Sequence, residues 1–192
     1  MKFALVAAAA VLAVAAPAAM APNQSVERAF AKGGHVRLDL VAAEYRISGS
    51  PDNKVRVSWW TNKAGVAERV RVTIDVHGRT ATVRTHGPKN GGLHFQIDVP
   101  ERSDLDVDLS AGDITVRGIE GNKSLDMWAG DATIDVGPTE QYRRVDASVR
   151  FGDISAPPFN TSKGGIFRSF TWRGSGKYTV RARLFAGDLK LR

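Results

Sequence analysis

Apolar and polar residues alternate along most of the chain, and a short recurring sequence interrupts the alternation. The copies are SAGDITV at 110–116, WAGDATI at 128–134, RFGDISA at 150–156 and FAGDLKL at 185–191, with AAEYRI at 42–47 as a divergent fifth copy. A period of two predicts half-buried β-strands, because successive side chains of a strand point to opposite faces. We therefore interpret the five segments as copies of one unit that contains two strands.

The alternation also predicts which residues face the core. Counted from the glycine, or from Ala43 in the fifth copy, the positions five, three and one before it and two and four after it are all apolar or tyrosine. They are Leu38, Leu40, Ala42, Tyr45, Ile47; Val107, Leu109, Ala111, Ile114, Val116; Leu125, Met127, Ala129, Ala132, Ile134; Ala147, Val149, Phe151, Ile154, Ala156; and Ala182, Leu184, Ala186, Leu189, Leu191. We expect these residues to face inward.

The phase of the alternation changes at each glycine. Two residues, Gly and Asp, separate the last inward position of one strand from the first of the next, where strict alternation allows one. The inserted residue predicts a β-bulge or a corner, and glycine takes the positive φ needed there without steric cost. The aspartate can accept hydrogen bonds from backbone N–H groups left unpaired by the corner. The predicted structural corners are Ala43, Glu44, Gly112, Asp113, Gly130, Asp131, Gly152, Asp153, Gly187 and Asp188.

The spacing of the corners predicts how the units are arranged. Gly112 and Gly130 are 18 residues apart, and Gly130 and Gly152 are 22 apart, which suits one coil of a β-solenoid with stacked corners. Alternating runs on both sides of His77-Gly78 predict a hairpin, so the N-terminal part is expected to be more antiparallel. The predicted fold is all-β, a β-solenoid or β-helix-like stack of strand–corner–strand units in a single domain at 35–192, after a lead-in at 19–34.

The first residues are typical of a secretory signal peptide. Met1-Lys2-Phe3 precedes an apolar run at 4–16, and small residues follow Pro17. We predict a signal peptide at 1–18, with residue 21 as the latest cleavage point, and an extracytoplasmic location in the periplasm, at the cell surface or outside the cell. An uncleaved anchor is the alternative, although about 14 apolar residues are fewer than the roughly 20 that cross a bilayer.

Composition and charge narrow the classes of partner that the protein is expected to bind. Hydrophobic residues make up 43% of the 192 and charged residues 24%, which is ordinary for a globular domain, and the net charge is +7. The basic residues are spread along the strands and form no run, which is typical of solvated partners of Asp and Glu. In an exported protein no nucleic acid is expected as a partner. For an exported basic protein the candidate partners are an anionic glycan, lipid head groups or an envelope protein. The chain has no cysteine, which excludes disulfides and thiolate chemistry.

No residue cluster predicts a cofactor, a metal or a catalytic site. The four histidines lack metal-binding spacing, and calcium at the Gly-Asp corners would find one carboxylate at each. The enzymatic alternative is a groove lined by outward carboxylates and arginines, as in β-helix enzymes that act on acidic polysaccharides. Its candidate residues are Asp106, Asp108, Asp126 and Asp135, with Arg117 or Arg143.

Aromatic residues predict a binding face. The residue two positions before the glycine faces outward and is Val41, Ser110, Trp128, Arg150 or Phe185 in the five copies. Stacked units would bring Trp128, Arg150 and Phe185 onto one flat surface, where a glycan ring or a partner protein could bind. The competing interpretation is that a loop or a terminal segment covers this surface.

The repeats resemble a known group of proteins. The AGD-hydrophobic segments, SAGDITVRGIEG at 110–121 and the closing GGIFRSFTWRGSGKYTVRARLFAGDLKLR at 164–192 are similar to exported bacterial domains of unknown function called "putative adhesins", relatives of adhesin-head β-repeat domains. The resemblance spans about 36–192 and implies an all-β repeat domain at or outside the cell envelope, with no catalytic residues. Ala43-Glu44 departs from the Gly-Asp pattern.

These observations predict an exported, non-enzymatic β-repeat domain with an adhesin-like or scaffold role in the envelope. The alternative is a β-helix enzyme acting on envelope or extracellular polysaccharide.

Overall fold

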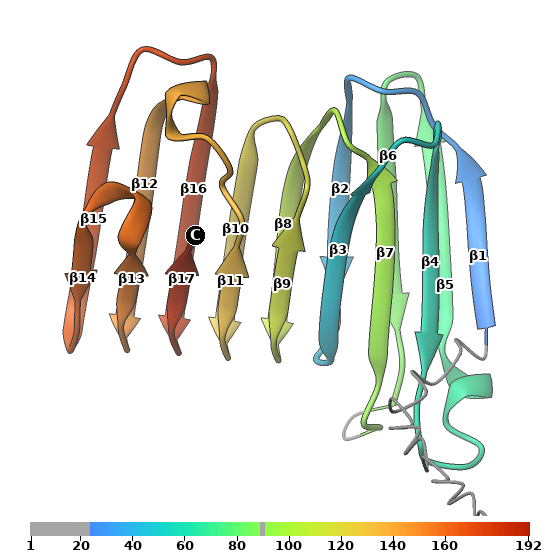
Figure 1. Cartoon of the computed structure of the whole chain (residues 1–192). Helices are drawn as coiled ribbons and strands as arrows, with labels where there is room; N and C mark the ends of the chain where they lie inside the picture. The colour runs from blue at the N-terminus through green and yellow to red at the C-terminus, as the bar shows by residue number, and fades with distance from the viewer. Residues whose placement is uncertain (1–23, 89–90) are drawn as a thin grey trace, which may run out of the picture.

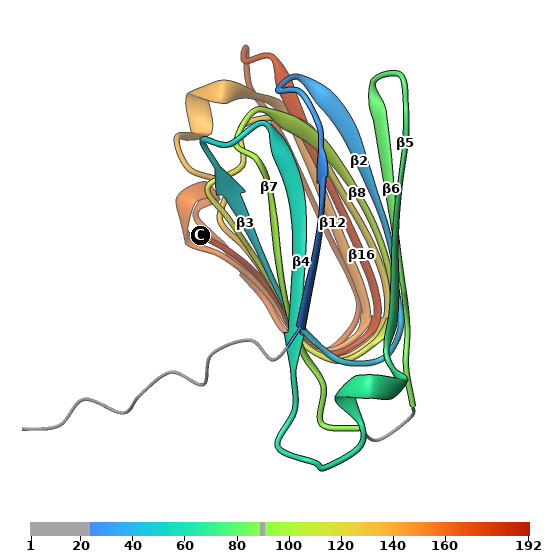
Figure 2. The ribbon, with the colours of Figure 1, turned by 90° about the vertical axis from the view of Figure 1, so that its right-hand side faces the viewer.

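Two mixed β-sheets face each other in the computed structural model, which describes residues 24–88 and 91–192 (Figures 1 and 2). The predicted signal peptide lies outside these residues. In order across the sheet, the nine-stranded sheet contains β1 (Gln24–Ala29), β4 (Lys54–Trp60), β7 (His94–Pro100), β3 (Glu44–Ser50), β9 (Ile114–Arg117), β11 (Ala132–Ile134), β17 (Leu189–Leu191), β13 (Ile154–Ala156) and β14 (Thr161–Lys163). The eight-stranded sheet contains β15 (Ile166–Arg173), β12 (Tyr142–Phe151), β16 (Tyr178–Ala186), β10 (Lys123–Ala129), β8 (Ser103–Ala111), β2 (Gly34–Leu40), β6 (Thr80–His86) and β5 (Arg71–His77).

The expected all-β class is confirmed. Three short 3-10 turns, η1 (Ala67–Arg69), η2 (Thr139–Gln141) and η3 (Pro157–Phe159), are the only helical segments in the described part of the chain. Neither sheet closes on itself, because each ends in two edge strands.

Each repeated unit contributes one strand to each sheet. The strand before the corner lies in the eight-stranded sheet and the strand after it in the nine-stranded sheet, so the corners join the two layers along one end of the molecule (Figure 1). Equivalent strands pair in parallel at equivalent positions; Leu125, for example, is in register with Val107 on β8 and Ala182 on β16. These segments therefore share their backbone pairing as well as their pattern of residues.

The stacking order of the units differs from their order in the sequence. The last unit, β16 with β17, lies between β10 with β11 and β12 with β13. Figure 1 shows this red pair between the yellow and orange strands. The intervening β14 and β15 pair antiparallel with β13 and β12 and form the edge of the stack.

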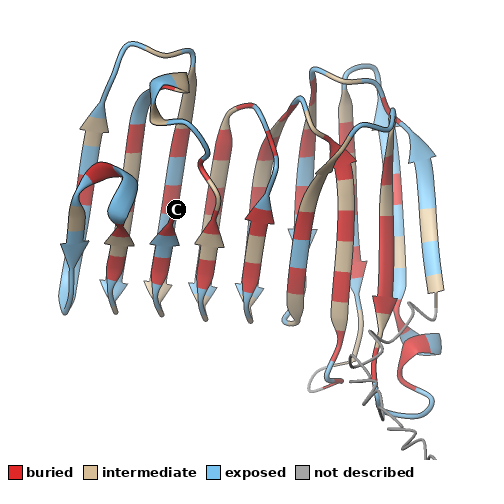
Figure 3. Ribbon diagram, viewed as in Figure 1, coloured by how far each residue is buried: buried red, intermediate tan, exposed pale blue. Residues whose placement is uncertain are grey.

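The core lies between the layers and is lined by the alternating apolar residues (Figure 3). Twenty of the 25 positions expected to face inward are buried. The position just before the glycine is the exception in every copy, and Phe151 is 44% exposed. Its ring packs outside the core, against Phe167 and Phe185. The expectation that this position lies inside is therefore wrong, because the two layers converge at the corners and leave no room for a ring between them (Figure 2).

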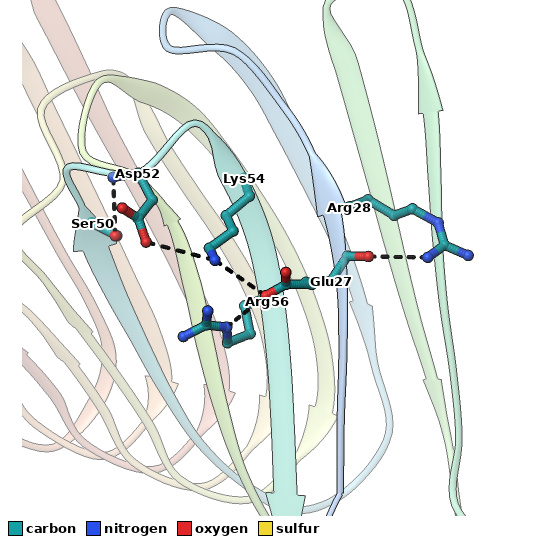
Figure 4. A network of polar contacts seen from close by, with 6 residues as sticks. All are labelled: Glu27, Arg28, Ser50, Asp52, Lys54 and Arg56. Atoms are coloured by element: carbon teal, nitrogen blue, oxygen red, sulfur yellow. Dashed lines mark hydrogen bonds and ion pairs between the residues drawn. The ribbon is translucent and has the colours of Figure 1, made fainter.

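The N-terminal part contains most of the antiparallel pairs, although it is mixed. β1, β4 and β7 pair antiparallel, and so do β5 and β6, while β2 and β3 are parallel to their neighbours. β1 falls within the expected lead-in and forms an edge of the sheet. Its Glu27 carboxylate lies 2.9 Å from Arg56 Nε and 3.2 Å from Lys54 Nζ (Figure 4). The hydrogen bond from Arg56 lowers the pKa of Glu27.

Candidate binding face on the eight-stranded sheet

The repeated glycines sit where the chain passes from one layer to the other. Gly112, Gly130, Gly152 and Gly187 have φ between +115° and +137°. At Gly130 an added Cβ would lie 2.0 Å from the carbonyl oxygen of Gly112 in the next unit, so both the dihedral angle and the stacking require glycine. Among the described non-glycine residues only Asn160 and Phe167 have positive φ, so the backbone at Ala43 turns differently.

The aspartates of the corners hydrogen-bond from unit to unit. Asp131 Oδ1 accepts the backbone N–H of Asp188 at 2.9 Å, and Asp188 Oδ1 accepts that of Asp153 at 2.9 Å. Asp113 and Asp153 make the equivalent bonds to Asp131 and Gly165. Each side chain therefore pairs an N–H group that the corner takes out of the sheet ladder. In the described ranges, no three Asp, Glu, His or Cys side chains are placed to hold a metal ion.

The outward residues two positions before the glycines form one row across the sheet. Trp128 on β10 and Phe185 on β16 stack face to face, with ring centroids 4.0 Å apart and planes 4° from parallel. The Arg150 guanidinium on β12 lies 5.4 Å from the centre of the Phe185 ring and 5.4 Å from that of Phe167 on edge strand β15. Along four neighbouring strands, the row therefore consists of the Trp128 ring, the Phe185 ring, the Arg150 guanidinium and the Phe167 ring. It contains all three residues of the predicted face.

The charge of Arg150 is not neutralised within the described structure. No carboxylate lies within ion-pairing distance of its guanidinium among residues 24–88 and 91–192, and its contacts there are the two phenylalanine rings. Arg183, two residues before Phe185 on β16, instead forms an ion pair with Asp126, with 2.6 Å between Nε and Oδ1. Contact with aromatic rings holds a cation in place without cancelling its charge, so Arg150 can still attract an anionic or polar group.

A groove of about 690 Å³ lies over this row. Its lining includes Trp128, Phe185, Arg150, Phe167, Asp108 and Ser110. The sequence predicts a flat face here, whereas the structure has a groove whose lining combines aromatic rings and arginines with small residues such as Ser110 and Ser148. Most of the large hydrophobic side chains that are exposed in the described residues also lie at this end of the sheet: Trp128, Phe151, Ile166 and Phe167. The other one, Val76, is on β5. An apolar patch of this kind is typical of a binding surface.

The sequence interpretation misses the contribution of β15. Phe167 is 68% exposed and has φ +53°, a conformation that bulky residues rarely adopt. The available signal was Ile166-Phe167 directly after Gly164-Gly165, where two adjacent apolar residues break the alternation. Only the antiparallel pairing of β15 with β12 places Phe167 beside Arg150.

The residues of the enzymatic alternative are only partly brought together. Asp108 and Asp126 are in register on β8 and β10 and both line the groove. Asp126, however, is held by Arg183. Asp135 lies in a separate hollow beside Pro138, at the far end of the strands from the corners. Arg117 is on the other sheet and Arg143 is at the start of β12, so neither belongs to the groove.

No helix in the described ranges has the length and hydropathy of a membrane span. No family model matches the sequence, and no curated protein matches it either. Among solved structures, a "putative cell adhesion protein" from Clostridium sporogenes is similar with a TM-score of 0.51 and 13% identity, over 88% of this chain and 98% of that one. A "putative lipid binding protein" from Parabacteroides distasonis has a TM-score of 0.33 and 10% identity, over 88% and 64% of the two chains. At such identities, the similarity to the Clostridium sporogenes protein is one of fold alone.

Proposed function

We propose that this chain is an exported, non-enzymatic binding domain with an adhesin-like or scaffold role at the cell envelope. Its units form a β-solenoid-like stack, and its partner binds the outer face of the eight-stranded sheet around Trp128, Phe185 and Arg150. The observation that carries the proposal is the exposed row of stacked rings with an arginine that has no carboxylate partner.

The architecture supports a binding role because it holds this row rigidly. Each ring stands on a different strand, and parallel pairing fixes the strands against each other over many residues. A preformed surface loses little conformational entropy when a partner binds. The apolar leader supports export, and the fold shared with the Clostridium sporogenes protein is consistent with an adhesion role.

The groove is less suited to glycoside hydrolysis. That reaction needs one carboxyl group that can give up a proton and a second that acts as a base or nucleophile. The Asp126 carboxylate is already engaged by Arg183, whose Nε lies 2.6 Å from its Oδ1, so it is not free to contact a substrate. Neither Asp135 nor Arg117 reaches the groove to complete such a site.

The proposal is tested by binding of the mature protein to isolated bacterial cell envelopes in a sedimentation assay. We expect saturable binding that the double variant Trp128→Ala/Arg150→Ala loses. Trp60→Ala/Arg56→Ala is the matched control, since both residues lie on β4 of the other sheet. Equal binding by the groove variant and the wild type would contradict the role proposed for this face.

A further inference from the structure

One face of the Trp128 ring is left bare in the groove. Phe185 stacks on the face that points to β16, and β10 lies between β16 and β8. The free face therefore points to β8, where the pairing of Ala129 with Ala111 and of Met127 with Leu109 places Ser110 beside it. Serine has no ring with which to continue the stack. The space over β8 next to Trp128 therefore contains no ring, and this space, called the slot below, is part of the groove.

Two polar side chains without partners border this slot. Asp108 and Ser110 are outward residues of β8, and both line the groove. Within 24–88 and 91–192, neither side chain has a hydrogen bond or an ion pair. The contrast is Asp126 on the neighbouring strand, whose carboxylate is held by Arg183. Asp108 is thus an acceptor without a partner in the described structure, two residues before Ser110 on β8 and in register with Asp126.

We propose that this slot, bordered by Trp128, Ser110 and Asp108, binds a neutral sugar ring of a glycan chain. A pyranose has a face of C–H groups that can stack on an aromatic ring, and hydroxyl groups at its rim that can donate hydrogen bonds to a carboxylate. In the slot itself, a sugar that carries a carboxylate would bring a second negative charge next to Asp108 and would be repelled. Arg150, which can attract an anionic group, stands three strands away from Asp108, on β12. This inference rests on the proposed function and narrows it to one class of ligand.

The experiment is a screen of labelled protein on an array of immobilised glycans, followed by calorimetric titration with the free oligosaccharides that bind. We expect neutral glycans to be retained. Trp128→Ala and Asp108→Asn should each weaken binding by about tenfold or more, the loss expected when a stacking surface or a charge-assisted hydrogen bond is removed. Trp60→Ala, the same change on the other sheet, should bind like the wild type.

Ser110→Trp separates loss of binding from loss of folding. The new ring would fill the slot and extend the stack of Trp128 and Phe185, so we expect an unchanged or higher Tm together with no glycan binding. Wild-type binding by this variant, or an array on which no neutral glycan is retained, would overturn the sugar assignment. If envelope binding still depends on Trp128 and Arg150 in that case, the proposed function stands and only the ligand class is wrong. If envelope binding is also insensitive to these residues, the proposed function fails as well.

Discussion

Phe185 and Trp128 stack in parallel planes although they belong to units that are far apart in the sequence. Their contact exists because β16 pairs with both β10 and β12, so the last unit of the chain fills the space between two earlier ones. Without this insertion, Trp128 and Arg150 would lie on neighbouring strands with no ring between them. The chain therefore completes the candidate binding face only when its C-terminal unit is in place.

The stacking of these two rings should be measurable as a coupling energy. In a double-mutant cycle of Trp128→Ala and Phe185→Ala, we expect a coupling of about 0.5–1.5 kcal/mol, the range for aromatic pairs. Urea unfolding of the four proteins provides the measurement. The single change at Trp128 should be mild because the ring is largely exposed. Strictly additive effects would mean that the rings do not interact in solution.

The corner glycines should be far less tolerant than the outward residues near them. In Gly130→Val, a β-branched side chain would be forced to φ +115° and into the carbonyl of Gly112, so we expect a loss of more than about 3 kcal/mol or failure to fold. Thr133→Val, an outward change on β11, should stay within about 0.5 kcal/mol of the wild type. Thermal unfolding followed by circular dichroism compares the two, and similar melting temperatures would contradict the role given to the corner.

The aspartates of the corners should contribute through their acceptor oxygens. Asp131→Ala leaves the Asp188 N–H without its partner, at an expected cost of about 0.5–1.5 kcal/mol in unfolding free energy. Asp131→Asn keeps a carbonyl oxygen in that place and should recover most of the loss. Chemical denaturation of both variants gives the comparison. If asparagine were as damaging as alanine, the charge of the carboxylate would matter more than the hydrogen bond.

Local alternation predicts the strands on either side of each Gly-Asp pair, because the alternation depends on residues close together in the chain. It did not predict β1, which lies in the expected lead-in, or that the backbone at Ala43 turns differently. The inserted residue at Gly130 and the inward Ile114 and Ile134 are visible as changes of phase in the sequence. Phe151 shows the limit of that reasoning. Its apolar character fits the inward pattern, but the narrowing of the space between the layers at the corner is a tertiary property, and it places the ring outside.

The candidate site was only partly predictable for a similar reason. Trp128, Phe185 and Arg150 share one position in the repeat, which places them in one row whatever the order of the units. The contribution of Phe167 depends on β15 pairing with β12, and the bare face of Trp128 depends on which strand lies on each side of β10. Strand order in a sheet is set by long-range pairing, which no local pattern encodes.

Lys123 is a buried cation at the start of β10, on the inner side of the eight-stranded sheet. Its ammonium donates a hydrogen bond to the Tyr142 hydroxyl at 2.6 Å. Burial lowers the pKa of Lys123 to about 8, although Asp135, Glu120 and Asp104 oppose this shift. Burial also raises the pKa of Tyr142 above its ordinary value. The folded protein therefore favours the neutral form of both groups.

The wild type should gain stability relative to Lys123→Met as the pH rises from about 8 to 10. In this window the unfolded chain keeps the lysine proton while the folded protein releases it, so the unfolding free energy increases with pH by up to about 1.4 kcal/mol per unit. Above the ordinary pKa of tyrosine, ionisation of unfolded Tyr142 acts in the opposite direction, but both proteins contain that residue and the difference largely removes its effect. Urea unfolding at several pH values measures the difference between the two proteins. A difference that does not change between pH 8 and 10 would mean that Lys123 reaches water in the folded state and titrates as it does in the unfolded chain.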